Sequence, residues 1–544
     1  MNTLSKPYKI FFLISSIIIL SLGIYFRFHH ITQNQFIYYD EGMWLLQNQE
    51  FVQFIEKAHH QGLNVQAKLV NIAFHLSLKT AKALWAFISI SRGFLVGADD
   101  YFFNRVVSAI FGTLTIIVCG LLARRLYQSA FVGILTAVLL SIMPSHVYYS
   151  RIALQEAFSA FFFLVGLYCY LFSSKISFRT FLASIFFACV YFVNYRMILI
   201  PIFILFCEFY LSCAEGQKIN LKKWLYHSLV FFAIVFGLGA LDHGANTYVT
   251  FGWIFHQSHL AHGTFDVFNF LSYPYYVFKF EGILFGLMFF GNIYFVVKKK
   301  WKEAFPFMFV LFFMVLFSFP QEKGVRYLTS AMPFMVMAVA GLISYLYSNK
   351  ILRRGTVMIV ILTFLLVVSQ TLESFYISRF KNDYQTSIAE IKKIDREAKF
   401  ISSQSLIQKM FVDDQKDVLE FKYGLAYLAK LYSSGYRYLI IDPQAYISFT
   451  DDQRRFSLTL MGYLEFFRKN ISPIKSYEHF NDRMLARFVL EHNENLRQSL
   501  LFLEKNKAEH YHKLNVYDLR VCMAAIKKVM DMNHLNSTKE SIGF

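Results

Sequence analysis

Residues 104–125 read NRVVSAIFGTLTIIVCGLLARR, an apolar run that ends in two adjacent arginines. Its length of about twenty residues is what a helix needs to cross the hydrocarbon core of a bilayer. Lysine and arginine accumulate on the cytoplasmic side of membrane proteins, so the arginine pair also predicts a direction. This stretch therefore predicts a membrane helix that begins outside and ends at the cytoplasm.

The composition of the chain is that of a membrane protein. Hydrophobic residues make up 56% of the 544 residues and charged residues only 17%, whereas soluble proteins carry roughly 25% charge. The net charge of +18 would suit nucleic acid. The basic residues lie in short runs between apolar segments, however, so we expect no nucleic-acid partner. The sequence contains about eleven apolar segments long enough to span a bilayer. They are 8–26, 104–123, 130–149, 157–173, 179–194, 197–213, 224–241, 282–297, 304–319, 327–347 and 355–372.

The loops between these segments alternate in charge, which predicts the topology. One set is short and basic, and together with the N-terminus it is expected to be cytoplasmic. Its members are Arg124-Arg125, Lys175 with Arg179, Lys218 with Lys222-Lys223, Lys298-Lys299-Lys300 with Lys302, and Lys350 with Arg353-Arg354. The other set is expected to be external. It comprises 27–103, 145–156, 242–281, 320–326 and all residues from 373 onward. Within loop 27–103 we expect amphipathic helices over 44–60 and 80–97, lying on the outer membrane face.

The region after 372 differs in composition and predicts a separate α/β domain. It contains most of the acidic residues of the chain. Three apolar runs are typical of strands, at 399–401, 436–441 and 486–490, and helical patterns occur near 383–396, 418–432, 453–468 and 495–506. We therefore expect a transmembrane catalytic domain over 1–372 and an external α/β domain over 373–544.

Acidic residues are scarce before 373, and we single out three of those on the predicted outer face. Asp40 and Glu41 follow the first span, and Glu156 follows the third. A carboxylate at an acceptor hydroxyl can act as general base, while a second one orients the acceptor or binds a cation. An isolated Asp40 would be read as the cap of a helix that begins near Met43. The surrounding pattern favours the catalytic interpretation.

Cations on the outer face need a reason, because the positive-inside bias disfavours them there. The stretch 320–327, PQEKGVRY, contains Lys323 and Arg326, and Arg196 lies between the fifth and sixth spans. Guanidinium and ammonium groups pair with phosphate oxygens, so these residues predict a site for a lipid phosphate. Lys82 is a weaker member of the set, because long loops escape the charge bias. The alternative is that these side chains merely extend to the membrane interface.

Histidines in loop 242–281 are weak candidates for a divalent metal site. His256, His259 and His262 recur every third residue and can share part of a helix face, although such histidines are more often ordinary interfacial residues. No other cofactor is predicted. Glu208, inside a span, is expected to pair with a polar neighbour.

Several motifs together resemble the GT-C superfamily of membrane glycosyltransferases. The similarity is greatest to family 39, which includes the protein O-mannosyltransferases and the lipid A aminoarabinose transferases. The acidic pair Asp40-Glu41 is similar to the motif that follows the first span of that family. Further similar stretches, in matching order, are 104–112, 123–127, 150–156 and 323–333 (KGVRYLTSAMP). The resemblance covers residues 10–372.

The resemblance implies an inverting transfer of a sugar from a polyprenyl-phosphate donor to a lipid, glycan or protein acceptor outside the cytoplasm. In this scheme Asp40 deprotonates the acceptor, and Glu41 and Glu156 orient it. Lys323, Arg326 and Arg196 stabilise the departing lipid phosphate. The location implied is the inner membrane of a bacterium, where the enzyme would also contact membrane lipid.

Three positions depart from the family pattern and leave the sugar and the acceptor open. Lys82 lies in a stretch without the usual proline pair, Glu156 replaces the more usual Asp, and Arg196 replaces the common Lys. The fold class expected is a polytopic α-helical membrane protein with a C-terminal soluble α/β domain. Two other functions are compatible with such a chain: a transporter or flippase of polyprenyl lipids or glycolipids, and a membrane scaffold with an external partner-binding domain.

Overall fold

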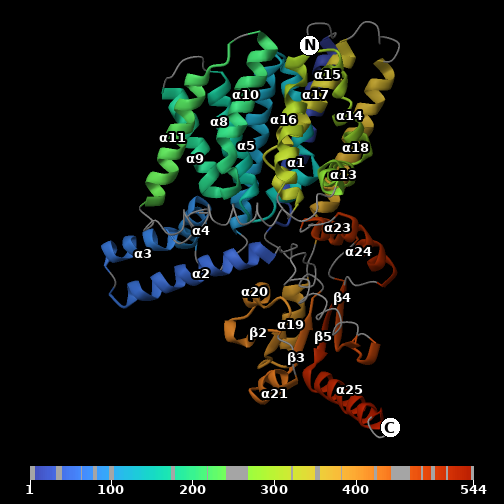
Figure 1. Ribbon diagram of the computed structural model, residues 1–544. Coiled ribbons are helices and arrows are strands. Elements are labelled where there is room, and N and C mark those ends of the chain that lie inside the picture. The colour runs from blue at the N-terminus through green and yellow to red at the C-terminus, as the bar shows by residue number, and fades with distance from the viewer. Residues whose placement is uncertain are drawn as a thin grey trace. The chain divides into compact units, whose positions relative to one another are not determined.

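The computed structural model describes most of the chain (Figure 1). The described residues are 6–31, 39–62, 64–77, 83–96, 103–172, 178–216, 218–240, 267–319, 323–348, 356–380, 383–421, 425–442, 466–467, 469–478, 482–491, 496–509 and 513–540. The chain divides into two compact units. Unit 1 comprises Met1–Gln33 and Asn48–Arg379, and unit 2 comprises Asn34–Gln47 and Phe380–Phe544.

Unit 1 is helical. Its helices are α1 (Lys6–Phe28), α3 (Val65–Ser77), α4 (Ala83–Val96), α5 (Phe103–Leu126), α6 (Ala130–Ser141), α7 (Pro144–Ser150), α8 (Glu156–Leu171), α9 (Phe178–Val193), α10 (Ile200–Glu215), α11 (Leu221–Ala240), α13 (Val267–Glu281), α14 (Ile283–Phe290), α15 (Ile293–Val297), α16 (Trp301–Ser318), α17 (Met332–Ser348) and α18 (Thr356–Ile377). Two short 3₁₀ helices are η2 (Tyr195–Leu199) and η3 (Val325–Leu328). Helix α2 (Tyr39–His60) begins in unit 2 and continues into unit 1.

Each of the predicted spans overlaps a helix or a pair of helices, which confirms the prediction of a polytopic helical membrane protein. Among the described residues, four helices are long and apolar enough by themselves to cross a bilayer. They are Phe103–Leu126, Tyr195–Glu215, Trp301–Ser318 and Val357–Ile377. Most of the other spans contain apolar helices of 10–17 residues or the bent pair α6 and α7.

One span is broken at a proline. Helices α6 and α7 meet at an angle of 62°, and Pro144 begins α7, where its ring cannot coexist with a continuous helix. The break frees carbonyl groups at the end of α6. Arg27 donates to the carbonyl oxygens of Leu140 at 3.2 Å and Ser141 at 2.5 Å, and Ser374 donates to that of Ile142 at 2.8 Å. Side chains from α1 and α18 thus satisfy the broken backbone inside the bundle.

The two predicted amphipathic segments are helical. Segment 44–60 lies within α2, and 80–97 corresponds to α4; α3, between them, was not predicted. Helix α4 contacts α9 and the start of α5, and in Figure 1 α3 and α4 run across the end of the bundle. Their position on the outer face of a membrane stays a prediction.

Unit 2 contains a small mixed sheet with helices around it. The strands are β1 (Phe400–Ser402), β2 (Val418–Glu420), β3 (Tyr438–Ile441), β4 (Lys475–Glu478) and β5 (Lys513–Asp518). Its helices are α19 (Tyr384–Ile394), α20 (Ser405–Gln408), η5 (Lys409–Phe411), η6 (Gln415–Asp417), α21 (Leu425–Ser433), α23 (Asp482–Glu491), α24 (Leu496–Glu509) and α25 (Leu519–Glu540). The strand order is β2-β1-β3-β5-β4. Strands β1, β2 and β3 are parallel, whereas β5 is antiparallel to both β3 and β4. The predicted α/β character is confirmed.

One secondary-structure prediction in unit 2 was wrong, and another was right only in part. Residues 486–490, predicted as a strand, lie in the buried helix α23. Arg487 and Glu491 are four residues apart, a spacing that suits one face of a helix. The predicted strand, 486–490, ends before Glu491 and therefore did not include this spacing. The helix predicted over 418–432 is confirmed only in its second half, as α21, because Val418–Glu420 form strand β2 and pair with β1. The predicted helix at 453–468 lies almost wholly outside the described residues.

Candidate active site

The segment between α16 and α17 carries two of the predicted phosphate-binding cations in a buried position. Lys323 is 1% exposed and Arg326 7%. The chain turns through η3, where the Thr329 hydroxyl donates to the Arg326 carbonyl oxygen at 2.5 Å. On the other side, the Tyr276 hydroxyl of α13 donates to the carbonyl oxygen of Lys323 at 3.4 Å. Hydrogen bonds from both sides therefore hold the backbone of this segment.

Arg196 joins this segment from another part of the bundle. It lies in η2, directly after α9, and the Asn194 side chain accepts a hydrogen bond from its backbone N–H at 3.3 Å. Its guanidinium donates to the Tyr327 hydroxyl at 3.0 Å and lies 4.1 Å from the centroid of the same ring. The Arg326 guanidinium lies 5.4 Å from that centroid. The structure therefore gathers two of the predicted cations around Tyr327.

Glu156 lies close to the same segment. It is the first residue of α8 and is 2% exposed. One turn later, Ser159 and Ser330 form a hydroxyl–hydroxyl contact of 3.1 Å, so the start of α8 packs beside the chain that follows η3. A carboxylate at a helix N-terminus is favourable for the helix dipole. Glu156 is thus placed where it can serve both the helix and a ligand held by the cations.

Arg151 anchors the turn that precedes Glu156. It donates to the carbonyl oxygen of Phe26, to that of His29 at 2.9 Å and to that of Ser378 at 3.1 Å. These carbonyls belong to the ends of α1 and α18, where helices leave acceptors without internal partners. One arginine therefore ties the 150–156 turn to two helices. The sequence singled out this stretch as a motif but gave Arg151 no role.

The acidic pair lies in unit 2, at the start of α2. Both residues are helical, and Glu41 is buried. A Cβ placed on the next residue, Gly42, would meet the Ile407 side chain at 2.8 Å, so the first turn of α2 packs directly on α20. Only glycine allows this close approach. The beginning of the helix at Tyr39, one residue before Asp40, differs from the cap near Met43 considered from the sequence.

Some predicted residues lie outside the described part of the chain. These are Lys82 and the histidines His256, His259 and His262. Within the described ranges, no group of three or more His, Cys, Asp and Glu side chains is arranged to hold a metal ion. Glu208 has the partner expected of it, since it accepts a hydrogen bond from Lys223 at 2.7 Å.

The arrangement in unit 1 suits an anionic ligand at one end of the bundle. Lys323, Arg326 and Arg196 supply ammonium and guanidinium donors, and burial strengthens their interaction with a negative charge. Tyr327 orients two of these groups, and its role could not be read from the sequence, where it appears only as part of the KGVRYLTSAMP motif. Such a cluster is able to bind a phosphate and to stabilise it as a leaving group.

Comparisons with known proteins show what the chain resembles. Residues 17–251 match the sequence profile of the family described as dolichyl-phosphate-mannose-protein mannosyltransferase. The structure is similar to that of ArnT from Cupriavidus metallidurans bound to undecaprenyl phosphate, with a TM-score of 0.52 and 12% sequence identity over 88% of this chain and 97% of that one. The apo form of the same enzyme gives a TM-score of 0.52, 12% identity and coverage of 87% and 96%.

A second enzyme shares the fold. The archaeal oligosaccharyltransferase AglB from Archaeoglobus fulgidus, in complex with an inhibitory peptide and a dolichol-phosphate, gives a TM-score of 0.51 and 10% identity over 81% of this chain and 70% of that one. No protein of curated function matches the sequence significantly. The chain therefore shares its fold with two membrane enzymes, ArnT and AglB. Residues 17–251 resemble the protein mannosyltransferases, and nothing in the comparisons supports a transporter.

Proposed function

We propose that the protein transfers a sugar from a polyprenyl-phosphate donor to an acceptor hydroxyl on the non-cytoplasmic side of the membrane, with inversion at the anomeric carbon. The observation that carries the proposal is the gathering of Arg196 and Arg326 around Tyr327, beside the buried Lys323. Two of the similar structures contain a polyprenyl phosphate, undecaprenyl phosphate in ArnT and dolichol-phosphate in AglB.

The cations act on the donor. They bind the phosphate that links the sugar to the lipid, and they hold the negative charge that the phosphate keeps when the glycosidic bond breaks. Because Arg196 stacks on a ring and donates to its hydroxyl, its guanidinium is oriented before the ligand arrives. A preoriented cation gives up little conformational freedom when the donor binds.

The carboxylates act on the acceptor. Asp40 takes the proton of the acceptor hydroxyl, whose oxygen attacks the anomeric carbon while polyprenyl phosphate leaves. Glu41 and Glu156 orient the acceptor or adjust the charge around Asp40. The acceptor is a lipid, a glycan or a protein. The amphipathic donor requires a site at a membrane boundary. Binding of its phosphate explains why cations lie on the predicted outer face, where the positive-inside bias disfavours them.

The topology proposed follows from the basic loops. The N-terminus faces the cytoplasm, the C-terminal domain is external, and the membrane is the inner membrane of a bacterium. The proposed domain boundary lies where the last predicted span ends, so that residues 1–372 form the catalytic domain and residues 373–544 the external domain. In this arrangement the external domain is free to contribute to acceptor binding.

A purified-protein assay tests the function. The full-length protein is incubated with a panel of radiolabelled polyprenyl-phosphate hexoses and pentoses and with candidate acceptors, and the release of polyprenyl phosphate is measured. Transfer from at least one donor, with an inverted product by NMR, is expected. Failure with every donor in a folded sample contradicts the proposal.

Donor-binding variants test the site separately. Lys323→Gln and Arg326→Gln should each weaken donor affinity by about tenfold or more, since a hydrogen bond to a charged group contributes about 1.5–3 kcal/mol. Lys298→Gln removes an exposed cation from a basic loop that has no part in the proposed site, and should leave affinity unchanged. Unchanged affinity in both site variants would show that these cations merely extend to the interface.

A further inference from the structure

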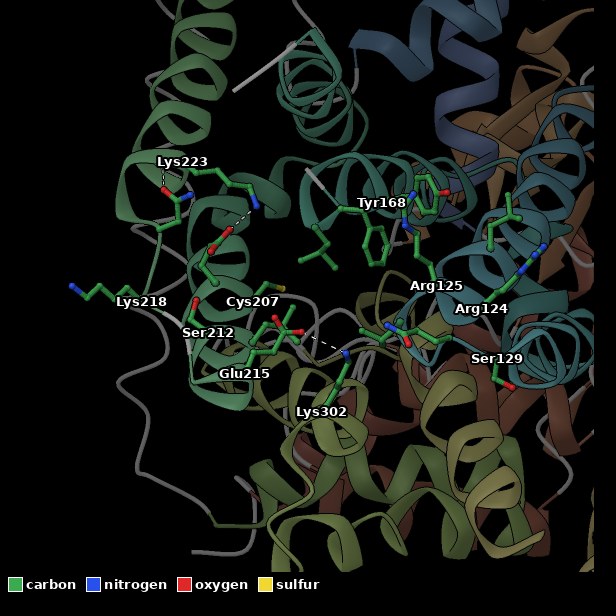
Figure 2. A pocket seen from close by; sticks show the side chains of 18 of the residues that line it. Arg124, Arg125, Ser129, Tyr168, Cys207, Ser212, Glu215, Lys218, Lys223 and Lys302 are labelled. Atoms are coloured by element: carbon green, nitrogen blue, oxygen red, sulfur yellow. Dashed lines mark hydrogen bonds and ion pairs between the residues drawn. The ribbon is translucent and has the colours of Figure 1, made fainter. Parts of the chain in front are cut away.

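A second basic site lies at the other end of the unit 1 bundle. A cavity of about 1120 Å³ opens between the last turns of α5, α8 and α10 and the first turns of α6, α11 and α16 (Figure 2). Its cationic lining residues are Arg124, Arg125, Lys218, Lys223 and Lys302. They come from three basic loops that are far apart in the sequence. Three of the basic loops that predict the topology therefore meet at one cavity.

The acids in the lining already have partners, which leaves the cavity with excess positive charge. Glu208 pairs with Lys223 at 2.7 Å, and both side chains are about nine-tenths buried. Lys223 also lies 3.9 Å from the centroid of the Tyr170 ring. Glu215 forms a longer, exposed pair with Lys302 at 3.5 Å. The two pairs appear as dashed lines in Figure 2.

The remaining cations are Arg124, Arg125 and Lys218. In the described part of the chain, no carboxylate forms an ion pair with any of the three. Lys218 lies at the rim, and its side chain extends outward in Figure 2. The two arginines are therefore the groups best placed to receive an anion, and Lys218 adds to the local field.

The Arg125 side chain is fixed in a way that leaves its donors free for a ligand. Its guanidinium lies 4.7 Å from the centroid of the Phe172 ring and 5.9 Å from that of Tyr168. Stacking uses the face of the guanidinium, whereas its N–H groups point from the edge. An arginine held in this way is preorganised to donate two parallel hydrogen bonds to a phosphate.

The turn that carries the arginines is also fixed. Gln128 adopts a left-handed backbone conformation with φ of 50°, and the Ser129 N–H donates to the Arg124 carbonyl oxygen at 3.1 Å. The Ser129 hydroxyl then caps α6 by accepting from the Val132 N–H at 3.4 Å. The dipole of α5 accounts for cations in its last turn. It does not account for a cavity formed with five other helices.

Apolar side chains share the lining with the cations. Leu121, Leu171 and Phe172 line the same cavity, and Leu121, in a helix long and apolar enough to cross a bilayer, is 47% exposed. A free phosphate ion has no apolar part that could contact this surface. A phospholipid has one, because its phosphate and its first methylene groups lie side by side at the depth of such helix ends.

We propose that this cavity binds the head group of an anionic phospholipid from the leaflet that faces the basic loops. The phosphate lies against Arg124 and Arg125, and the start of the acyl chains lies against Leu121 and Phe172. The bound lipid neutralises the excess positive charge and joins α5, α8 and α10. The proposal does not depend on sugar transfer, because the cavity is separate from the Tyr327 cluster.

Lipid binding to the full-length protein tests the proposal. Purified protein in a neutral detergent is titrated with phosphatidylglycerol, and binding is followed by native mass spectrometry. Phosphatidylcholine with the same acyl chains and inorganic phosphate alone are the comparison ligands. The double variant Arg124→Gln/Arg125→Gln is compared with Lys298→Gln/Lys299→Gln. The second variant removes the same charge from two consecutive lysines that do not line the cavity.

The expected result is selective binding of phosphatidylglycerol by the wild type and by the lysine variant. The arginine variant should bind roughly thirtyfold more weakly, because each basic side chain beside an anionic lipid contributes about a factor of five. Equal affinity in the two double variants overturns the proposal. So does equal binding of phosphatidylcholine, and displacement by millimolar inorganic phosphate would show a free-anion site instead. If the arginine double variant fails to fold, Lys218→Gln against Lys298→Gln gives the same comparison with a smaller expected difference of about fivefold.

Discussion

Arg196 donates a 3.0 Å hydrogen bond to the Tyr327 hydroxyl and lies 4.1 Å from the centroid of the same ring, although the two residues are 131 positions apart. The contact joins η2, which follows α9, to η3, which precedes α17. The hydrogen bond and the ring contact act on the same guanidinium, so Tyr327 sets the position and the plane of the Arg196 guanidinium. In the proposed reaction this contact organises the phosphate site before the donor binds.

Removing only the Tyr327 hydroxyl should therefore weaken donor binding. Tyr327→Phe keeps the ring and its stacking on Arg196 but loses the hydrogen bond, and donor affinity is expected to fall about tenfold. The dissociation constant of a polyprenyl-phosphate donor, measured by fluorescence anisotropy or competition, checks this result.

Tyr294→Phe is the matched control. Its hydroxyl contacts the Tyr345 hydroxyl at 3.1 Å at an exposed position in the bundle, so the substitution also removes one tyrosine hydrogen bond. It should leave donor affinity unchanged. If both variants bind donor equally well, Tyr327 does not orient the site.

The packing of α1 on α6 gives a stability prediction. A Cβ on Gly23 would lie 2.4 Å from the Ser141 carbonyl oxygen, a backbone atom beside the break at Pro144. Gly23→Ala should therefore force the helices apart and destabilise the protein by about 1–3 kcal/mol. A lower midpoint of thermal unfolding in detergent is the expected measurement.

Gly237→Ala provides the comparison for this substitution. Gly237 also lies in a helix, α11, but nothing in the described structure approaches a Cβ placed on it within 4 Å. Alanine is the better helix former there, so stability should stay the same or rise slightly. Equal losses in the two variants would mean that the α1–α6 contact is looser than the structure indicates.

Native cysteines offer a test of topology. Cys213 is exposed at the end of α10, on the side predicted to be cytoplasmic, whereas Cys522 is buried in unit 2. Burial raises the pKa of the Cys522 thiol to about 12. A raised pKa keeps the thiol protonated at neutral pH, so Cys522 should not react. An impermeant maleimide added outside should label an introduced Lys416→Cys and leave Cys213 unlabelled until the membrane is opened. Labelling of Cys213 in sealed cells would reverse the proposed orientation.

Much of unit 1 could be predicted because its determinants are local. Length and hydropathy identify a span without reference to the rest of the chain, and each predicted segment contains a helix. Pro144 could have predicted the break between α6 and α7, but the side chains that satisfy it, Arg27 and Ser374, come from distant helices. Such partners depend on tertiary packing and leave no local signal.

Some short strands of unit 2 could not be predicted, because their determinants are not local. Strands β1 and β3 are apolar and were expected, whereas β4 (KSYE) and β5 (KLNVYD) alternate weakly with charged residues and were missed. Their strand conformation comes from pairing with each other and with β3. The contact of Arg196 with Tyr327 likewise could not be predicted, although Arg196 was a predicted phosphate-binding cation and Tyr327 lies in the KGVRYLTSAMP motif.

In the proposed reaction Asp40 is the base in a sugar transfer from a polyprenyl-phosphate donor. A single-turnover assay with saturating donor tests it most directly, because it separates the chemical step from binding. Asp40 is the second residue of α2, and Asp40→Asn keeps the size of the side chain but cannot accept a proton. The rate should fall by about 10²–10⁴, with donor binding nearly unchanged. Glu41→Gln should reduce the rate less, and Glu156→Gln should fall between the two. An Asp40→Asn enzyme that retains more than about a tenth of the wild-type rate would contradict the account, since loss of a general base costs more than that.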